Sequence, residues 1–327
     1  MLQRLHQTER PFLVIGRGGM DLYPDPPGSR TEDATSFFPA LGGSSANIAV
    51  ALCKFGQQAK LVTCVSDDAI GRYVVNQLNH YGIDASAVRP VQQGTRSSLA
   101  VVESRVENHQ SVIYRNHAAD FQMDRSDVEG LDYRQYAALV VTGTCLTQDP
   151  SQTATLSALR QAKAAGIPTV MDLDYRPYSW QSPDHARQVY HLALEMLDVI
   201  VGNDDEFGQM AGGYDQGPDY AAQLATQGKI AIFKRGSEGS TTYLPNGQQI
   251  DTGVAQVTPL KPTGAGDSFL GGLLAGMCRH GDLPQALKQG SACAAMVVTR
   301  VACAPAMPDL TELEHFLSKH SIAQSTS

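Results

Sequence analysis

The sequence predicts an α/β fold in which a mostly parallel sheet lies between two layers of helices. From Ala138 onward, short apolar runs alternate with amphipathic stretches, and this order is typical of a parallel sheet covered on both faces. Of the 327 residues, 42% are apolar, which is enough for a large core. No internal repeat or low-complexity segment interrupts the pattern, so we expect one domain over residues 1–327.

The first half of the chain begins this pattern. Phe12–Ile15 is an apolar run that ends at glycine, as buried parallel strands often do. We expect helices over 45–55 and 69–81, with a strand over 60–65 between them. Two segments, about 20–41 and 97–121, instead alternate polar and apolar residues, which is typical of half-buried strands.

The second half continues the alternation to the end of the chain. The expected strands are 138–142, 169–173, 199–202 and 230–233, and the expected helices are 151–165, 185–196 and 220–227. A hairpin of 240–244 with 249–257 turns at Asn246-Gly247. Helices from 265, 284 and 310 close the fold, and the serine-rich end, 321–327, should be frayed.

Charge and composition exclude several classes of partner. A net charge of −8 argues against nucleic acid and anionic membranes. The six cysteines form no CxxC pair, and we expect reduced thiols in the core. Residues 1–10 are polar, which predicts no signal peptide, and no apolar run is long enough to span a bilayer. We therefore expect a soluble cytoplasmic protein.

The most informative stretch is Gly264-Ala265-Gly266-Asp267, which runs into an apolar helical pattern from Phe269 onward. The turn thus lies at a helix N-terminus, where free backbone N–H groups and the helix dipole bind anions. Glycine lets this backbone approach a phosphate closely. Asp267 could accept a proton from a hydroxyl beside that phosphate. A simple helix cap with an exposed aspartate is the alternative.

A second glycine turn, Gly42-Gly43, also runs into a helix that carries Asn47. Together, the two stretches resemble the two signatures of the ribokinase-like (PfkB) carbohydrate kinases, and the resemblance extends from about 12 to 308. It implies a ribokinase-like three-layer α/β/α sandwich that uses ATP and Mg²⁺. It also implies that 20–41 and 97–121 form a small β-lid over a sugar pocket, whose apolar outer face could pair two copies as a homodimer.

The resemblance also implies roles for individual residues. Asp267 would be the catalytic base, and the Gly264, Ala265 and Gly266 amides would stabilise the transferred phosphoryl group. The sugar's hydroxyls would be bound by Asp21, Gly42, Gly43 and Asn47. The Gly16-Arg17-Gly18-Gly19 turn also invites a dinucleotide-binding interpretation, but prolines and no helix follow it.

The nucleotide side depends on a third group of residues. The chain has no GxxxxGK[ST] motif, so a P-loop is excluded. The resemblance implies nucleotide contacts from Asn203, Lys234, Gly236, Gly239 and Ser291, and a water-mediated Mg²⁺ contact from Glu206. A helix cap at 203–206, a tight turn at 236–239 and helix packing at Ser291 are the alternatives.

Two arginines that follow predicted strands, Arg115 and Arg176, match positions that contact the carboxylate of sugar acids in this family, and a guanidinium suits that group. Finer matches, including Asp174-Tyr175-Arg176-Pro177-Tyr178, resemble the branch that phosphorylates 5-dehydro-2-deoxy-D-gluconate in myo-inositol catabolism. A 2-keto-3-deoxygluconate kinase, a fructokinase and a non-catalytic sugar-binding protein stay open as alternatives.

Three positions depart from the family pattern. Lys261 stands where many relatives carry an aspartate that helps to hold a monovalent cation, so its ammonium group would replace the cation's charge. We therefore expect activity that does not depend on potassium. Ser66 replaces a glycine of the first signature, and Cys303 replaces a sugar-contacting aspartate of the 2-keto-3-deoxygluconate kinases.

Overall fold

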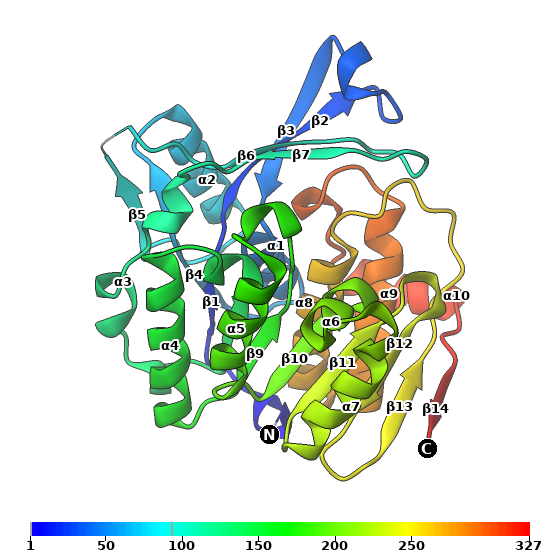
Figure 1. The fold of residues 1–327 in the computed structure, drawn as a ribbon. Coiled ribbons are helices and arrows are strands. Elements are labelled where there is room, and N and C mark those ends of the chain that lie inside the picture. Colours follow the sequence, from blue (N-terminus) through cyan, green and yellow to red (C-terminus); the bar gives the residue numbers. More distant parts are fainter. Residues whose placement is uncertain (1, 93) are drawn as a thin grey trace.

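The computed structural model describes residues 2–92 and 94–327, and its centre is a ten-stranded sheet (Figure 1). The strands from β5 to β11 are parallel, and β12, β13 and β14 continue the sheet in antiparallel order. The spatial order is β14 (Gln324–Thr326), β13 (Gln249–Thr252), β12 (Ser240–Tyr243), β11 (Ile230–Lys234), β10 (Val199–Asn203), β9 (Thr169–Asp172), β8 (Leu139–Thr142), β1 (Phe12–Ile15), β4 (Ala59–Ser66) and β5 (Val88–Val91).

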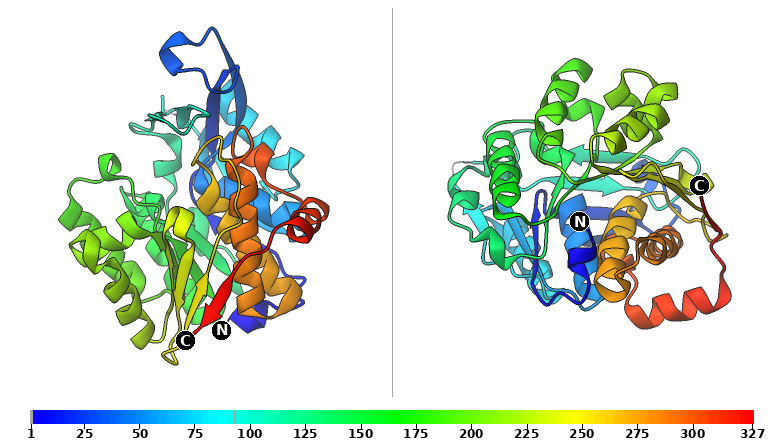
Figure 2. Two further views of the ribbon diagram at one scale, coloured as in Figure 1. Left: turned by 90° about the vertical axis from the view of Figure 1, so that its right-hand side faces the viewer. Right: turned by 90° about the horizontal axis from the view of Figure 1, so that it is seen from below.

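Helices cover both faces of this sheet, as Figure 2 shows from below. Alternate residues of β1 point to opposite cores: Phe12 and Val14 pack with α1, α2, α8 and α9, and Leu13 and Ile15 pack with α4 to α7. The helices are α1 (Ser44–Lys54), α2 (Ala69–His80), α3 (Ser126–Glu129), α4 (Ser151–Ala165), α5 (Pro183–Leu194), α6 (Asp204–Ala211), α7 (Gly217–Thr226), α8 (Ala265–His280), α9 (Leu283–Val298) and α10 (Leu310–Lys319). This arrangement is the predicted ribokinase-like α/β/α sandwich.

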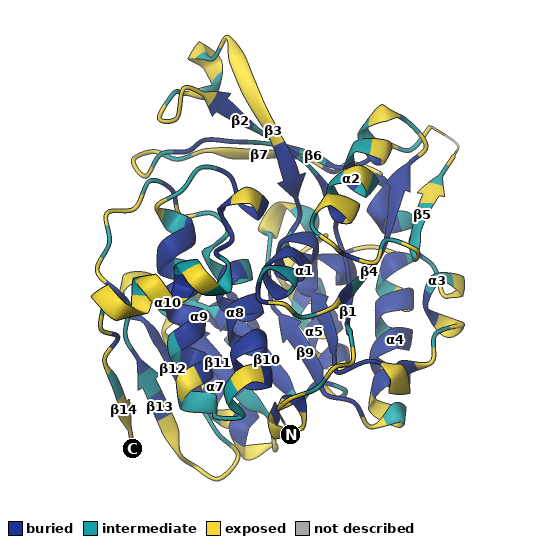
Figure 3. Ribbon diagram, turned by 180° about the vertical axis from the view of Figure 1, so that it is seen from behind, coloured by how far each residue is buried: buried dark blue, intermediate teal, exposed yellow. Residues whose placement is uncertain are grey.

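A second sheet of four strands stands over the carboxyl ends of the parallel strands (Figure 1). Its order is β3 (Ser36–Gly42), β2 (Gly19–Asp25), β6 (Leu99–Val102) and β7 (Ser111–Tyr114). The buried Glu103 carboxylate accepts hydrogen bonds from the Thr31 and Gln110 amides, which joins the two halves of this lid. Its outer strands are exposed (Figure 3), including Phe38 and Tyr114, and pairing of two lids stays a prediction.

The structure differs from the sequence-based prediction at two places, the last hairpin and the end of the chain. The strand expected over 249–257 ends at Thr252. The chain end expected to be frayed instead forms β14, which pairs with β13 in register, Ile250 opposite Thr326. The free edge of β13 explains the difference, because its unpaired backbone groups gain hydrogen bonds from any strand that reaches them.

The cysteine prediction is confirmed, since all six thiols are free and only Cys53 is not fully buried. Across residues 2–92 and 94–327, none of the helices combines the length and apolarity that crossing a bilayer requires.

Candidate active site

A cavity of about 650 Å³ lies between the lid and the carboxyl ends of the parallel strands. The starts of α1 and α8, the lid strands and the ends of β9, β10 and β11 all contribute to its wall. In open α/β sheets, ligands bind at this edge, where loops from different strands converge. The volume is in the range of small-molecule sites.

The start of α8 faces this cavity and depends on glycine. Gly264 has φ +84°, and a Cβ there would lie 2.9 Å from the Cys303 sulfur, so a larger residue does not fit. A Cβ on Gly266 would lie 3.1 Å from Lys234 Nζ, so its absence lets the ammonium group approach the first turn. The Gly264 N-cap position offers no side-chain acceptor to the first amides, which leaves this helix start suited to an anion.

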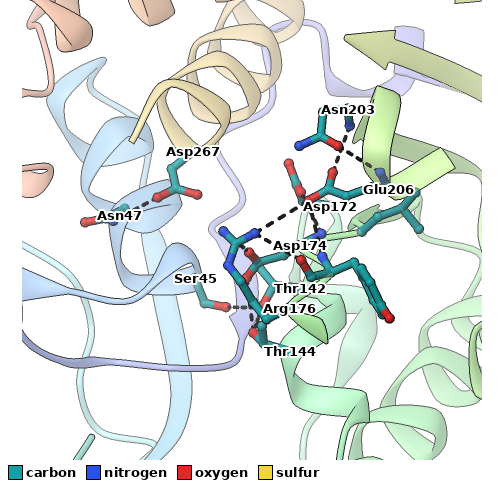
Figure 4. Close-up of polar contacts among 12 residues, drawn as sticks. Ser45, Asn47, Thr142, Thr144, Asp172, Asp174, Arg176, Asn203, Glu206 and Asp267 are labelled. Carbon is teal, nitrogen blue, oxygen red and sulfur yellow. Dashed lines mark hydrogen bonds and ion pairs between the residues drawn. The ribbon is translucent and has the colours of Figure 1, made fainter. Parts of the chain in front are cut away.

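Asp267, in the first turn of α8, faces Asn47 of α1, and Asn47 Nδ2 donates to Asp267 Oδ2 at 2.8 Å (Figure 4). Burial raises the pKa of Asp267 to about 8, and the negative charges of Asp174 and Asp172 add to this rise. The Asn47 hydrogen bond and Arg176 oppose it. A carboxyl group that titrates near neutral pH is suited to general-base catalysis.

Opposite Asp267, two ion pairs follow β9. Lys234 Nζ lies 3.2 Å from Asp172 Oδ2, and Arg176 Nη2 lies 2.7 Å from Asp174 Oδ1. Burial alone would lower the pKa of Lys234, but the nearby carboxylates raise it above the ordinary value. Lys234 therefore stays cationic beside the start of α8, where it can meet a phosphate.

Glu206 and Asn203 form a capping box at the start of α6. Each residue's side chain accepts the other's backbone N–H at 2.8 Å, and Glu206 Oε1 also accepts the Tyr175 amide at 3.2 Å. Burial raises the pKa of Glu206 to about 7, and Asp172 adds to the rise. The helix-cap alternative is therefore present in the structure, and both residues also line the cavity.

These contacts fit an indirect role for Glu206 toward Mg²⁺. Both of its carboxylate oxygens already accept backbone hydrogen bonds. Within residues 2–92 and 94–327, no three His, Cys, Asp or Glu side chains gather closely enough to ligate a metal by themselves. Because Mg²⁺ keeps several waters and is often held with substrate phosphates, the carboxylates here suit contact through water.

Most of the residues predicted to contact the sugar border the same cavity. Asp21, Gly43, Asn47, Arg115 and Arg176 all line it. The remaining one, Gly42, lies behind Asp21 instead, since a Cβ there would be 1.9 Å from Asp21 Oδ1. Gly42 thus makes room for the carboxylate, and direct contact with a sugar stays a prediction.

The remaining nucleotide-side residues, Gly236, Gly239 and Ser291, also line the cavity with Lys234. Gly239 has φ +90° and belongs to the tight turn between β11 and β12. The Ser291 hydroxyl donates to the Gly253 carbonyl at 2.6 Å, so it also helps to fix the loop after β13. The tight-turn alternative at 236–239 is present in the structure, and the nucleotide contacts of Gly236, Gly239 and Ser291 stay predictions.

Sequence analysis assigned no role to Arg17, Asp172, Asp174 or Tyr178, which also line the cavity. Asp172 lies near the end of the predicted strand 169–173 and Asp174 directly follows it, and that position is a usable signal. Arg17 also follows a strand, β1, but the glycines around it are typical of a turn whose backbone, and not a side chain, contacts a ligand. Tyr178 follows Arg176 closely and carried no signal of its own.

Lys261 is completely buried beside the start of α8, and its ammonium group donates to the Thr263 carbonyl. Burial lowers its pKa, and the nearby Cys303 and Asp267 oppose this shift. A fixed positive charge at this position supports the expectation that the loop before α8 needs no bound cation.

We expect equal activity in potassium, sodium and tetramethylammonium chloride at matched ionic strength. The physical reason is that the Lys261 ammonium group already supplies the charge that a monovalent cation would bring. Steady-state rates in the three salts check this, and a severalfold increase specific to potassium would contradict it.

The sequence matches one protein family and several curated enzymes over nearly its whole length. The family described as "pfkB family carbohydrate kinase" matches residues 12–310. A 5-dehydro-2-deoxygluconokinase of Photobacterium profundum is 36% identical over 318 residues, covering 95% of this chain and 96% of the relative. The enzyme of the same name from Lacticaseibacillus casei is 36% identical over 313 residues, covering 94% and 95%.

Solved structures share the fold over nearly the whole chain. Aminoimidazole riboside kinase from Salmonella enterica, complexed with aminoimidazole riboside and an ATP analogue, has a TM-score of 0.81 at 25% identity, covering 94% of this chain and all (100%) of that one. Fructokinase from Vibrio cholerae, with fructose, ADP and calcium bound, has a TM-score of 0.84 at 24% identity, covering 94% and 99%.

Proposed function

Because this chain belongs to the pfkB family of carbohydrate kinases, we propose that it transfers the γ-phosphoryl group of ATP to the terminal hydroxyl of 5-dehydro-2-deoxy-D-gluconate. This reaction belongs to myo-inositol catabolism. The observation that carries the proposal is the position of Asp267: a carboxylate with a raised pKa, held by Asn47 at an uncapped helix start.

The geometry supports a direct transfer. The sugar's terminal hydroxyl lies against Asp267, and its oxygen bonds to the γ-phosphorus as the bond from that phosphorus to ADP breaks. The hydroxyl proton passes to Asp267. Phosphoryl transfer depends mainly on positioning and on charge stabilisation, which the α8 amides and Lys234 provide.

The nucleotide occupies the end of the cavity lined by Lys234, Gly236, Gly239 and Ser291. When bound, Mg²⁺ would neutralise phosphate charge; Glu206 would hold it through water, and Asn203 would contact the nucleotide. The lid covers the opposite end, where Asp21 and Asn47 bind the sugar's hydroxyls. Closure over the sugar excludes water, which would otherwise compete as the acceptor.

A panel of acceptors tests this function. Purified protein with MgATP is offered 5-dehydro-2-deoxygluconate, 2-keto-3-deoxygluconate, fructose and ribose, and ADP release is followed. We expect the highest kcat/KM with 5-dehydro-2-deoxygluconate. Preference for another acceptor would contradict the proposed substrate. Sugar binding without ADP release from any acceptor would contradict the kinase activity.

A further inference from the structure

Three arginines reach the sugar end of the cavity from different parts of the chain. Arg17 follows β1, Arg115 follows β7 and Arg176 follows β9. All three line the same cavity as Tyr178, and their positive charges oppose the rise that burial causes in the pKa of Tyr178. They differ in how far the protein itself already occupies them.

The Arg115 guanidinium group is already hydrogen-bonded to other residues of the protein. Its Nε and Nη2 atoms both donate to Asp120 Oδ2, at 2.9 and 2.5 Å, and Nη2 also donates to the Thr144 carbonyl. The Phe121 ring covers one face of the guanidinium, 4.2 Å from its centre. This buried pair ties the lid strand β7 to the loop after β8, and it uses Nε and both Nη2 hydrogens, which leaves only Nη1 of Arg115 for a substrate.

Arg176 is also largely occupied. Nη2 pairs with Asp174, Nη1 donates to the Tyr175 carbonyl, and Nη1 also lies 3.8 Å from Glu206. Two protein carboxylates therefore already face this one cation. Its charge still contributes at the site, but most of its attraction for a third carboxylate is compensated.

Within the part of the chain that the structure describes, Arg17 meets only one carboxylate, and at a longer distance than the other two arginines meet their nearest ones. Nε donates to Ser98 Oγ at 2.6 Å, and Nη2 donates to Asp21 Oδ1 at a longer 3.3 Å. In residues 2–92 and 94–327, no other hydrogen-bond acceptor was found for its five N–H groups, so both Nη1 hydrogens are free. The side chain is only 10% exposed, and Arg17 lines the cavity.

Arg17 and Asp267 line the same cavity beside the start of α1. Gly43, at the start of α1, lies against Arg17, because a Cβ there would be 2.3 Å from the Arg17 carbonyl oxygen. Asn47, one helical turn later, contacts Asp267. A substrate with its terminal hydroxyl at Asp267 therefore shares this cavity with the Arg17 guanidinium.

We propose that Arg17 binds the carboxylate of the sugar-acid substrate and is the residue that selects an acid over a neutral sugar. This assignment rests on the proposed function and deepens it. Ser98 and Asp21 fix the orientation of the guanidinium, so its free edge is pre-organised for a planar anion. Asp21 partly balances the charge, and bidentate binding supplies the remaining specificity.

The test compares Arg17→Gln with wild type on two acceptors: 5-dehydro-2-deoxygluconate and its primary amide, which keeps every hydroxyl and the keto group. For the acid, kcat/KM should fall about 10- to 100-fold, the range for a lost hydrogen bond to a charged group. For the amide, it should fall much less, because the amide loses only the support that Arg17 gives to Asp21. Arg96→Gln, which removes a 74% exposed guanidinium beside the lid, is the matched control and should behave as wild type.

Equal losses on both acceptors would overturn the proposal and leave Arg17 as a support for Asp21 and the lid. If Arg17→Gln melts at a much lower temperature, Arg17→Lys replaces it, because lysine keeps the charge and loses the planar fork; the same acid-selective loss is expected. If wild type releases no ADP with the acid, the proposed function fails separately. Calorimetric binding of acid and amide to wild type and variant then decides the role of Arg17.

Discussion

Asp267→Asn should lower kcat by about a hundred- to ten-thousand-fold, the range for removal of a general base. Asparagine is nearly isosteric and can still accept the Asn47 hydrogen bond, so nucleotide affinity should be unchanged. Stopped-time ADP assays and a nucleotide titration measure the two quantities. Asp205→Asn, an exposed acid in the first turn of α6, is the control and should be fully active.

The pH dependence of wild type and of Asp267→Asn provides a second test of this role. Because burial raises the pKa of Asp267 to about 8, wild-type kcat/KM should rise about tenfold per pH unit below that value and then level off. The folded protein favours the protonated form, so stability is complete below the unfolded pKa and falls as pH rises through 8. Asp267→Asn should therefore melt no earlier than wild type at pH 8. If the Asp267→Asn variant folds and retains a near-wild-type rate, Asp267 is not the general base.

Lys234→Met should reduce kcat/KM for ATP by about a hundred- to a thousand-fold, as expected for loss of one group that stabilises transition-state charge. The ammonium group is buried, pairs with Asp172 at 3.2 Å and lies beside Gly266 at the start of α8. Its removal also leaves Asp172 and Glu206 without their shared cation, which raises the pKa of Glu206 further. Steady-state kinetics with varied ATP measure the effect.

Lys229→Met is the matched control for this variant. Lys229 directly precedes β11 and donates to the Leu194 and Leu197 carbonyls at the end of the strand away from the cavity. Its loss should cost stability and leave kcat/KM for ATP unchanged. Comparable kinetic losses in the two variants would show that Lys234 supports the strand and does not act on the phosphates.

The parts of the site that the sequence predicts are those encoded locally. The turn at 264–267 shows small residues, an acid and then a helical apolar period, and the structure places it at the start of α8 as expected. Asn203 and Glu206 come from the family resemblance, with a helix cap as the alternative, and the structure shows that this cap is a capping box.

What the sequence could not show are pairings between distant residues. Arg17 meets Ser98, 81 positions away, and only the folded lid brings them together. The sequence predicts a contact of Arg115 with a sugar acid, and its partner Asp120 becomes apparent only when the chain turns back after β7. Likewise, residues 324–326 form strand β14 because they pair with the free edge of β13, and the composition of 321–327 does not predict this pairing.

The most direct measurement is the proton-coupled phosphorus NMR spectrum of the product formed from 5-dehydro-2-deoxygluconate and MgATP. Transfer to the terminal hydroxyl predicts a phosphomonoester signal split into a triplet by the two protons of the neighbouring CH₂ group, appearing together with ADP. A doublet would place the phosphate on a secondary hydroxyl. That result, or ADP without any new phosphomonoester, would contradict transfer to a terminal oxygen held at Asp267.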